Sequence, residues 1–276
     1  MIETYNRLDK SRPFSPSKGN QTKYRIGNTW LKEDYLGYEA ASEYLCSQIL
    51  EYSNVQDFVR YTMATGTANE QNVHFCASEH FLQAGEQLIT LHDAWESLYG
   101  VPFYKSMERL STEERIRTTV DFMENQLKIM NAGEELTRLL EWDAFVLNED
   151  RHSNNIAFIE DTDGNFRFAP MFDNGAAFLS DTHAYSLQEN PHKLITKVKS
   201  KPFNVDFKKQ VQVAESLYGK QLQLYPMDLE NTFCDIRGQY GVLVANRIKV
   251  VCQHQFEKYA DFFMEYQQEK GDDYEY

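Results

Sequence analysis

Two short β-prone runs and an amphipathic segment open the part of the chain that carries a clear pattern. The runs TKYRI (22–26) and TWLKED (29–34) flank a Gly-Asn pair, which is typical of a β-hairpin with a tight turn. In the following segment, 37–54, the apolar residues recur at helical spacing. The pattern therefore predicts a hairpin followed by a helix.

Further strands are expected after this unit, and a loop before it. The apolar runs DFVRYTMA (57–64) and VHFCASEHFL (73–82) are typical of strands, whereas residues 1–20 are rich in Ser, Pro, Lys and Asn and are expected to form a loop or loose arm. The first 85 residues are thus predicted to form a small sheet that carries one helix.

Beyond residue 85 the periodicity becomes mainly helical. Helices are predicted over 89–100, 111–130 and 134–147, and the second opens with Ser111 and Glu114 at the spacing of a capping box. Two short apolar strands, at 156–160 and 166–172, are joined by the turn DTDGN, and the chain from about Asp181 is mixed and then mostly helical. We predict an α+β protein with a β-rich N-terminal lobe (1–85), a larger, mainly helical C-terminal lobe (86–276) and a ligand-binding cleft between the lobes.

Composition excludes several classes of protein. With 276 residues, 42% hydrophobic and 14% aromatic residues, the chain is long and apolar enough to bury a core. The net charge of −14 gives no overall basic surface for nucleic acid, and no apolar run approaches the length of a membrane helix. The four cysteines are scattered, and neither a CxxC pair nor a leader pattern is present. We therefore expect a soluble, cytoplasmic protein with reduced thiols, although these features do not exclude export as an effector.

A cluster of polar residues between two apolar segments, FVLNEDRHSNNIAF, points to chemistry. Asp150 and Asn155 are five residues apart in a loop between a helix and a strand. Asp173 comes 18 residues after Asn155, at the end of the second of the two predicted strands. An Asp, an Asn and a later Asp in this order suit phosphoryl transfer, with Asp150 as the acceptor of a substrate hydroxyl proton and Asn155 and Asp173 as Mg²⁺ ligands. Mg²⁺ prefers carboxylate, amide and phosphate oxygens, which is why these residue types fit. For His152 we favour a scaffold role over that of a base, and Arg151 is expected either to contact phosphate or to pair with a neighbouring acid.

A cation for the nucleotide phosphates is also present in the N-terminal lobe. Lys32 lies on a predicted strand, and Lys23 on the preceding strand can add charge. Glu39 at the start of the next helix is the first choice to pair with Lys32, and Glu43 one turn later is the competing choice.

The motifs LNEDRHSNNIAF and FAPMFDNG resemble the catalytic core of the HipA-like serine/threonine protein kinases. The segment KYRIGNTWLKEDYLGYEAASEYLCSQIL resembles their nucleotide lobe, so the resemblance covers most of residues 15–180, and it is closest to the short, stand-alone members. It implies a bilobal protein-kinase-like fold, the use of ATP and Mg²⁺, and phosphorylation of Ser or Thr on a protein substrate, often including the kinase itself.

The resemblance also implies roles for individual residues. Asp150 would be the catalytic base, Asn155 and Asp173 the magnesium ligands, and Lys32 the contact to the ATP phosphates, held by Glu39. The hinge would lie near 78–85, where backbone groups around His80 and Phe81 would meet adenine. Ser15 and Ser17 are the candidate autophosphorylation sites. An antitoxin-like partner, known for longer members, is left open because this chain begins almost at the nucleotide lobe.

Three alternatives remain. The phosphoinositide lipid kinases share the DRHxxN motif and the late Asp, but this chain is short and acidic, without an evident membrane-binding surface. Small-molecule kinases usually carry a His before the catalytic Asp, where this chain has Glu149. A pseudokinase that acts only as a binding module is disfavoured by the intact set of Lys32, Asp150, Asn155 and Asp173.

Overall fold

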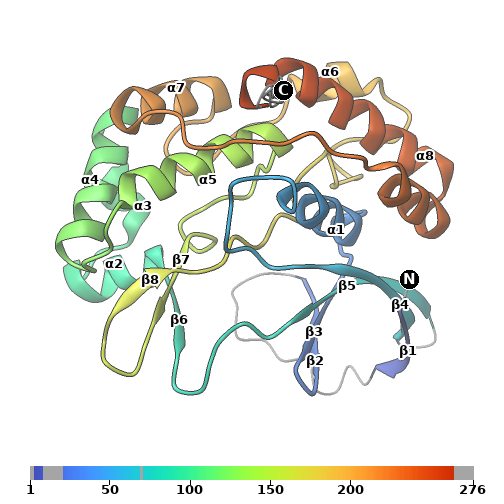
Figure 1. Ribbon diagram of the computed structural model, residues 1–276, viewed down its shortest axis with the longest axis horizontal. Helices are drawn as coiled ribbons and strands as arrows, with labels where there is room; N and C mark the ends of the chain where they lie inside the picture. Colours follow the sequence, from blue (N-terminus) through green and yellow to red (C-terminus); the bar gives the residue numbers. More distant parts are fainter. Residues whose placement is uncertain (1–2, 9–20, 69–70, 264–276) are drawn as a thin grey trace, which may run out of the picture.

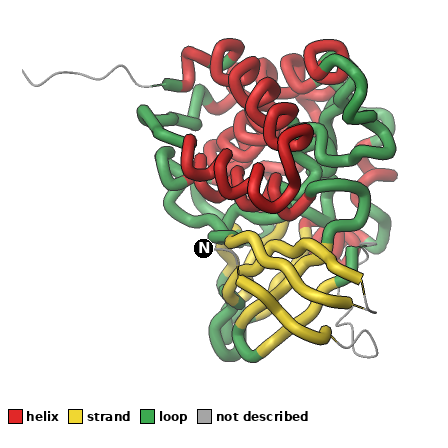
Figure 2. Tube along the Cα trace, turned by 90° about the vertical axis from the view of Figure 1, so that its right-hand side faces the viewer, coloured by secondary structure: helices red, strands yellow, loops and turns green. Residues whose placement is uncertain are grey.

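The computed structural model describes residues 3–8, 21–68 and 71–263. Its strands gather at one end of the molecule and its helices at the other, as Figures 1 and 2 show. Within the described part, no helix is long and apolar enough to cross a membrane. The predicted fold class, a small β-rich lobe followed by a larger helical lobe, is confirmed.

The N-terminal lobe is a five-stranded sheet in the order β1-β4-β5-β3-β2 with one helix against it. The bounds are β1 Glu3–Leu8, β2 Lys23–Ile26, β3 Thr29–Glu33, α1 Glu39–Leu50, β4 Thr62–Ala68 and β5 Gln71–Glu79. The predicted hairpin is confirmed as β2 and β3, and Gly27 adopts the positive φ of 60° that their tight turn requires.

Two expectations for this lobe were wrong. Part of the supposed N-terminal arm forms β1, which pairs in parallel with β4. The strand expected from residue 57 begins only at Thr62, because Phe58 makes an isolated bridge to Met171 and Val59 donates its N–H to the Met171 carbonyl. Residues 57–61 therefore connect the two lobes instead of extending the sheet.

The C-terminal lobe holds a three-stranded sheet and most of the helices. Its elements are β6 Gln87–Thr90, α2 Leu91–Tyr99, α3 Phe103–Met107, α4 Thr112–Asn125, α5 Ala132–Val146, β7 Ala157–Glu160, β8 Phe166–Phe168, α6 Pro191–Ile195, α7 Phe207–Tyr218, α8 Glu230–Lys258 and the 3-10 turn η1 Ala260–Phe262. The predicted capping box starts α4, where Ser111 and Glu114 bind each other's backbone N–H groups. The first two residues of the expected helix at 89–100 instead end β6, and Thr90 caps α2.

The hydrophobic core runs through both lobes. Leu45 and Ile49 of α1 lie in the same buried cluster as Trp142 and Phe145 of α5 and Ile248 of α8. A second cluster lies around Trp95 and Phe122 in the C-terminal lobe. Because α1 belongs to the larger core, the helix is fixed relative to the residues that follow α5, where the polar motif lies. The division at residue 85 stays a prediction.

Candidate functional site

Lys32 lies at the centre of a buried charged cluster. Its ammonium group is 2.7 Å from Glu43 Oε1, 2.8 Å from Asp173 Oδ1 and 3.3 Å from the Tyr61 hydroxyl. β3 presents Lys32, α1 carries Glu43, and Asp173 follows the hairpin of β7 and β8, 141 residues along the chain from Lys32. The fold therefore brings the predicted cation and the second predicted carboxylate into direct contact.

The charges of this cluster support one another. Burial on its own would lower the pKa of Lys32, but the carboxylates of Asp173 and Glu43 outweigh it and hold that pKa well above its ordinary value. Burial would likewise raise the pKa of Asp173, yet the charges of Lys32 and Lys23 outweigh burial and keep the pKa below its usual range. Asp173 is therefore ionised at neutral pH, as a metal ligand must be.

The pairing of Lys32 with Glu39 was wrong. Glu39 turns back on the loop before α1, where its carboxylate accepts the backbone N–H groups of Tyr35, Leu36 and Gly37 at 2.6–3.3 Å. Glu43, one turn later, reaches Lys32 and also accepts the N–H of Asn174 at 2.8 Å. The competing choice thus makes the contact, and it ties α1 to the residue after Asp173.

Lys23 stands beside Lys32 on the neighbouring strand. The two lysines are direct partners in the β2–β3 ladder. Burial and the charge of Lys32 lower the pKa of Lys23, whereas Asp173 and Glu43 act in the opposite direction. The structure therefore places a second positive charge near Asp173, as the sequence suggested.

Arg151 takes the second of its two expected roles, because it pairs with an acid inside the protein. It is 1% exposed, and its Nε lies 3.0 Å from Asp143 Oδ2. Its Nη1 donates to the backbone carbonyls of Asn155 and Phe172 at 2.9 and 2.8 Å. One guanidinium group thus holds together the two chain segments that carry Asn155 and Asp173.

Asn148 and Asn174 complete this buried network. Asn148 donates to Asp143 Oδ1 at 3.0 Å and accepts the Asp150 N–H at 3.2 Å. Asn174 Oδ1 accepts from Trp142 Nε1 and from Arg151 Nη2, at 3.1 and 2.9 Å. No role for Asp143, Asn148 or Asn174 was predicted from the sequence. Their one indication of a buried role is that they are acids and amides in segments that are otherwise apolar.

Asp150 lies on the outer side of the same loop. Its side chain is 46% exposed; Oδ1 is 2.8 Å from Lys201 Nζ, and Oδ2 is 3.6 Å from His152 Nε2. The Nδ1 of His152 accepts the Asn154 N–H at 3.2 Å, in keeping with the favoured scaffold role. Lys201 is a contact that sequence reasoning missed, because 51 residues separate it from Asp150.

The predicted metal ligands have oxygens suited to a hard cation. Asn155 donates its Nδ2 to the Asp150 carbonyl at 2.9 Å, and within the described residues its Oδ1 accepts no hydrogen bond. No group of three or more His, Cys, Asp or Glu side chains in the described ranges could hold a metal by itself. One carboxylate and one amide still fit Mg²⁺, which takes its other ligands from phosphates and water.

The expected hinge is only partly available to a nucleotide base. The backbone N–H of His80 donates to the Asn28 carbonyl at 2.8 Å, and its ring Nδ1 accepts from Trp30 Nε1 at 3.0 Å. The Phe81 ring packs against Phe172 with 6.1 Å between centroids. The His80 N–H is therefore already used, whereas Phe81 provides an aromatic wall next to Asp173.

The segment after Asp173 is fastened to the N-terminal lobe. Tyr38 donates its N–H to the Ser180 carbonyl, and Thr182 donates its N–H to the Leu36 carbonyl, at 3.2 and 3.1 Å. A Cβ atom at Gly37 would come within 2.1 Å of the Ser180 carbonyl oxygen, so only glycine permits this approach. Tyr185 donates its hydroxyl to Glu149 Oε2 at 2.6 Å, which fixes the segment beside Asp150.

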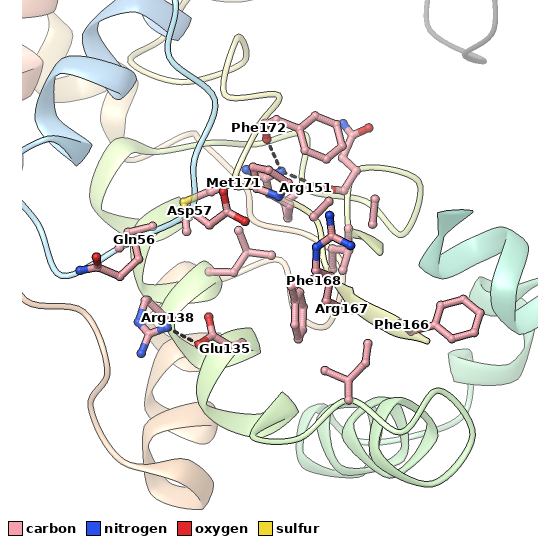
Figure 3. A pocket seen from close by; sticks show the side chains of 18 of the residues that line it. Gln56, Asp57, Glu135, Arg138, Arg151, Phe166, Arg167, Phe168, Met171 and Phe172 are labelled. Atoms are coloured by element: carbon pink, nitrogen blue, oxygen red, sulfur yellow. Dashed lines mark hydrogen bonds and ion pairs between the residues drawn. The ribbon is translucent and has the colours of Figure 1, made fainter. Parts of the chain in front are cut away.

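A separate cavity of about 530 Å³ opens behind the polar loop (Figure 3). Residues 54–57 of the N-terminal lobe, the start of α5 and strand β8 surround it, and Arg151 and Phe172 form part of its wall. Lys32, Asp150 and Asp173 do not line it. Asn155 does line it, so the cavity adjoins this predicted metal ligand but lies apart from the Lys32 cluster.

Comparisons with known proteins support the architecture. No protein-family model matches the chain, and no curated protein matches its sequence. A solved structure described as a Helicobacter pylori proinflammatory kinase, CtkA, is similar, with a TM-score of 0.63 and 15% identity, over 95% of this chain and 96% of that chain. At this identity the likeness establishes a kinase-like fold along nearly the whole chain. Ser15 and Ser17 lie outside the described residues.

Proposed function

We propose that the chain is an ATP- and Mg²⁺-dependent serine/threonine protein kinase of the HipA-like type that also phosphorylates itself. The observation that carries this proposal is the Lys32 cluster, in which one buried lysine contacts Glu43 and Asp173. Asp150 and Asn155 lie on the loop that Arg151 and Asn148 bind to the Asp173 segment. The kinase-like fold supports this chemistry, and the DRHxxN and FDNG motifs indicate which residues would carry it out.

Each residue has a role in the proposed reaction. Lys32 and Lys23 neutralise charge on the nucleotide phosphates, and Glu43 holds Lys32 extended. Asp173 and Asn155 would hold Mg²⁺, which would stabilise the charge that develops on the phosphates. Asp150 accepts the proton of the substrate hydroxyl while the hydroxyl oxygen attacks the terminal phosphorus of ATP. The bond between this phosphorus and ADP breaks at the same time.

The test is transfer of labelled phosphate from ATP in the presence of Mg²⁺, with the protein alone, with a protein mixture and with lipids. Label on serine or threonine supports the proposal. Label on lipid favours a lipid kinase, and nucleotide binding without transfer favours a pseudokinase.

Replacing Asp150 by Asn removes the proton acceptor but keeps the shape of the side chain. We expect transfer to fall by about 100- to 10,000-fold with an unchanged unfolding transition. Asp163→Asn, which removes an exposed carboxylate in the β7–β8 turn, is the matched control and should be fully active. Undiminished transfer by Asp150→Asn would exclude the role proposed for this carboxylate.

A further inference from the structure

A basic segment lies next to Asp150 in a chain that is otherwise strongly acidic. Residues 191–209 contain six lysines and only one acid, Asp206, whereas the whole chain has a net charge of −14. All six lysines are exposed: Lys193, Lys197, Lys199, Lys201, Lys208 and Lys209. The concentration of positive charge in one segment calls for a local explanation.

Lys201 places this segment at the opening of the candidate site. Its ammonium group is 2.8 Å from Asp150 Oδ1, and both side chains are about half exposed, at 49% and 46%. A hydroxyl that donates its proton to Asp150 must approach this exposed carboxylate. The substrate therefore passes beside Lys201 and the residues that precede it.

The backbone around Lys201 is fixed. Ser200 donates its N–H to the Val205 carbonyl at 3.0 Å and its hydroxyl to the Asn204 carbonyl, and Gln210 donates Nε2 to the Lys201 carbonyl at 3.1 Å. Ser200 is 2% exposed, whereas the lysines on either side of it, Lys199 and Lys201, are exposed. Two residues span at most about 7 Å of backbone, so Lys199 belongs to the same rigid stretch as Lys201, which contacts Asp150.

Much of this charge is not neutralised within the described residues. Lys197 pairs with Glu189 at 3.1 Å and Lys201 with Asp150, but Lys193, Lys199, Lys208 and Lys209 have no carboxylate within 4.0 Å in the described part of the chain. Asp206 is occupied as the cap of α7, where it accepts the Lys209 N–H. Among the described residues, no carboxylate competes with those of a partner for these four ammonium groups.

We propose that the substrate is a polypeptide with acidic residues beside its Ser or Thr, and that these residues bind along Lys193 and Lys199 while the hydroxyl reaches Asp150. The proposal rests on the protein-kinase function proposed above and specifies its substrate class. It favours a polypeptide over an anionic lipid surface, because Val205 is the only large apolar side chain that is strongly exposed in the segment 187–209, and binding to a bilayer relies on several such side chains.

The first measurement is equilibrium binding, which does not depend on catalysis. Three labelled peptides share one Ser acceptor, which is flanked by Asp and Glu, by Asn and Gln, or by Lys, and each is titrated with the full chain. The double variant Lys193→Gln/Lys199→Gln is compared with Lys128→Gln/Arg237→Gln, which removes two exposed charges at the end of α4 and on α8. Lys201 is left intact because it contacts Asp150.

We expect the acidic peptide to bind best, and to bind roughly tenfold more weakly to the Lys193/Lys199 variant, since each exposed ion pair contributes a factor of about 2–5. The control variant should bind like the unmodified protein, and added salt should reduce the difference. Equal binding of the neutral peptide, or an equal loss in the control, would overturn the proposal. So would binding to vesicles of phosphatidylserine in place of the peptide.

Phosphate transfer to the same peptides separates this proposal from the kinase function. Autophosphorylation with no preference among the peptides would leave the kinase function standing and reject the acidic substrate. Preferential binding of the acidic peptide without any transfer would reject the kinase function and leave only the recognition of acidic peptides standing. Transfer to the acidic peptide, with an increase in KM and not a decrease in kcat in the Lys193/Lys199 variant, would support both.

Discussion

The two faces of the polar loop between α5 and β7 are built in opposite ways. On the inner face, Arg151 is fully buried and donates to a carboxylate, two backbone carbonyls and an amide oxygen. On the outer face, the Asp150 side chain is nearly half exposed, and among the described residues only Lys201 lies within hydrogen-bond distance of its carboxylate. Arg151 thus supports the structure, whereas the adjacent Asp150 has the proposed chemical role. The side chains of these two residues point to opposite sides of the loop.

This difference indicates that the inner face of the loop keeps the backbone rigid, whereas the outer face leaves the Asp150 side chain free to change partners. The inner face fixes the backbone of the segments that carry Asn155 and Asp173, and Asp173 contacts Lys32. In the proposed reaction the outer face must exchange partners, because an incoming hydroxyl would have to displace Lys201 from Asp150. Substitutions on the inner face should therefore affect stability first, and those on the outer face should affect transfer first.

The largest effect is expected when Arg151 is replaced by Met. This change leaves the Asp143 carboxylate buried without its cation and removes the donor that joins Asn155 to Phe172. We expect the free energy of unfolding to fall by about 3–5 kcal/mol, measured by chemical denaturation, and transfer to be lost with it. The double variant Arg151→Met/Asp143→Leu should recover part of the stability but not the activity. An unchanged denaturation midpoint for Arg151→Met would show that the inner face does not support the loop.

The contrast between the faces also explains which features could be predicted from sequence. The hairpin, α1 and α4 follow from local periodicity and capping, and the structure bears them out. Strand β1 was missed because its polar residues pair in parallel with β4, about 60 residues away. Local sequence carries no record of such distant pairings.

The misassigned partner of Lys32 shows the same limit within a single helix. Glu39 and Glu43 are one turn apart, so helical periodicity places both on one face of α1. The helix packs so that Glu43 lies over Lys32 while Glu39 binds the preceding loop, and this depends on tertiary contacts with β4, β5 and α8. The pairing of Asp150 with Lys201 was inaccessible for the same reason.

These two glutamates provide a second, smaller test of the comparison between support and chemistry. Glu43→Gln removes the charge that holds Lys32 extended, and a small displacement of a positioning group costs about 100-fold in rate. Glu39→Gln is the matched variant, because it removes the same charge one turn away and should lower stability by about 1 kcal/mol through weaker capping. Steady-state kinetics with varied ATP measures the first effect and thermal unfolding the second. Comparable losses of transfer in both variants would mean that the contact of Glu43 with Lys32 has no special role.

The last test concerns a third setting, a carboxylate that is buried without a cation. Asp34 accepts the Ala40 N–H and the Tyr240 hydroxyl, both at 2.6 Å, and within the described residues it forms no ion pair. Burial raises its pKa to about 8, and these hydrogen bonds only partly oppose the shift. Asp173, which is also sheltered but contacts Lys32, has its pKa lowered instead. The cation, and not burial, therefore decides the direction of the shift.

The sign of this shift fixes a pH dependence. Because the folded-state pKa of Asp34 lies above the unfolded value of about 4, its contribution to stability is fully present below pH 4 and is lost as the pH rises to about 8. Asp34→Asn does not ionise, so its stability relative to the unmodified protein should rise between pH 5 and pH 8, by at most roughly 1 kcal/mol per pH unit. Denaturation midpoints measured across this range for both proteins provide the measurement, with Asp163→Asn as an exposed control. Parallel curves for Asp34→Asn and the unmodified protein would mean that Asp34 stays ionised in the fold, and that burial without a cation does not set this carboxylate apart from Asp173.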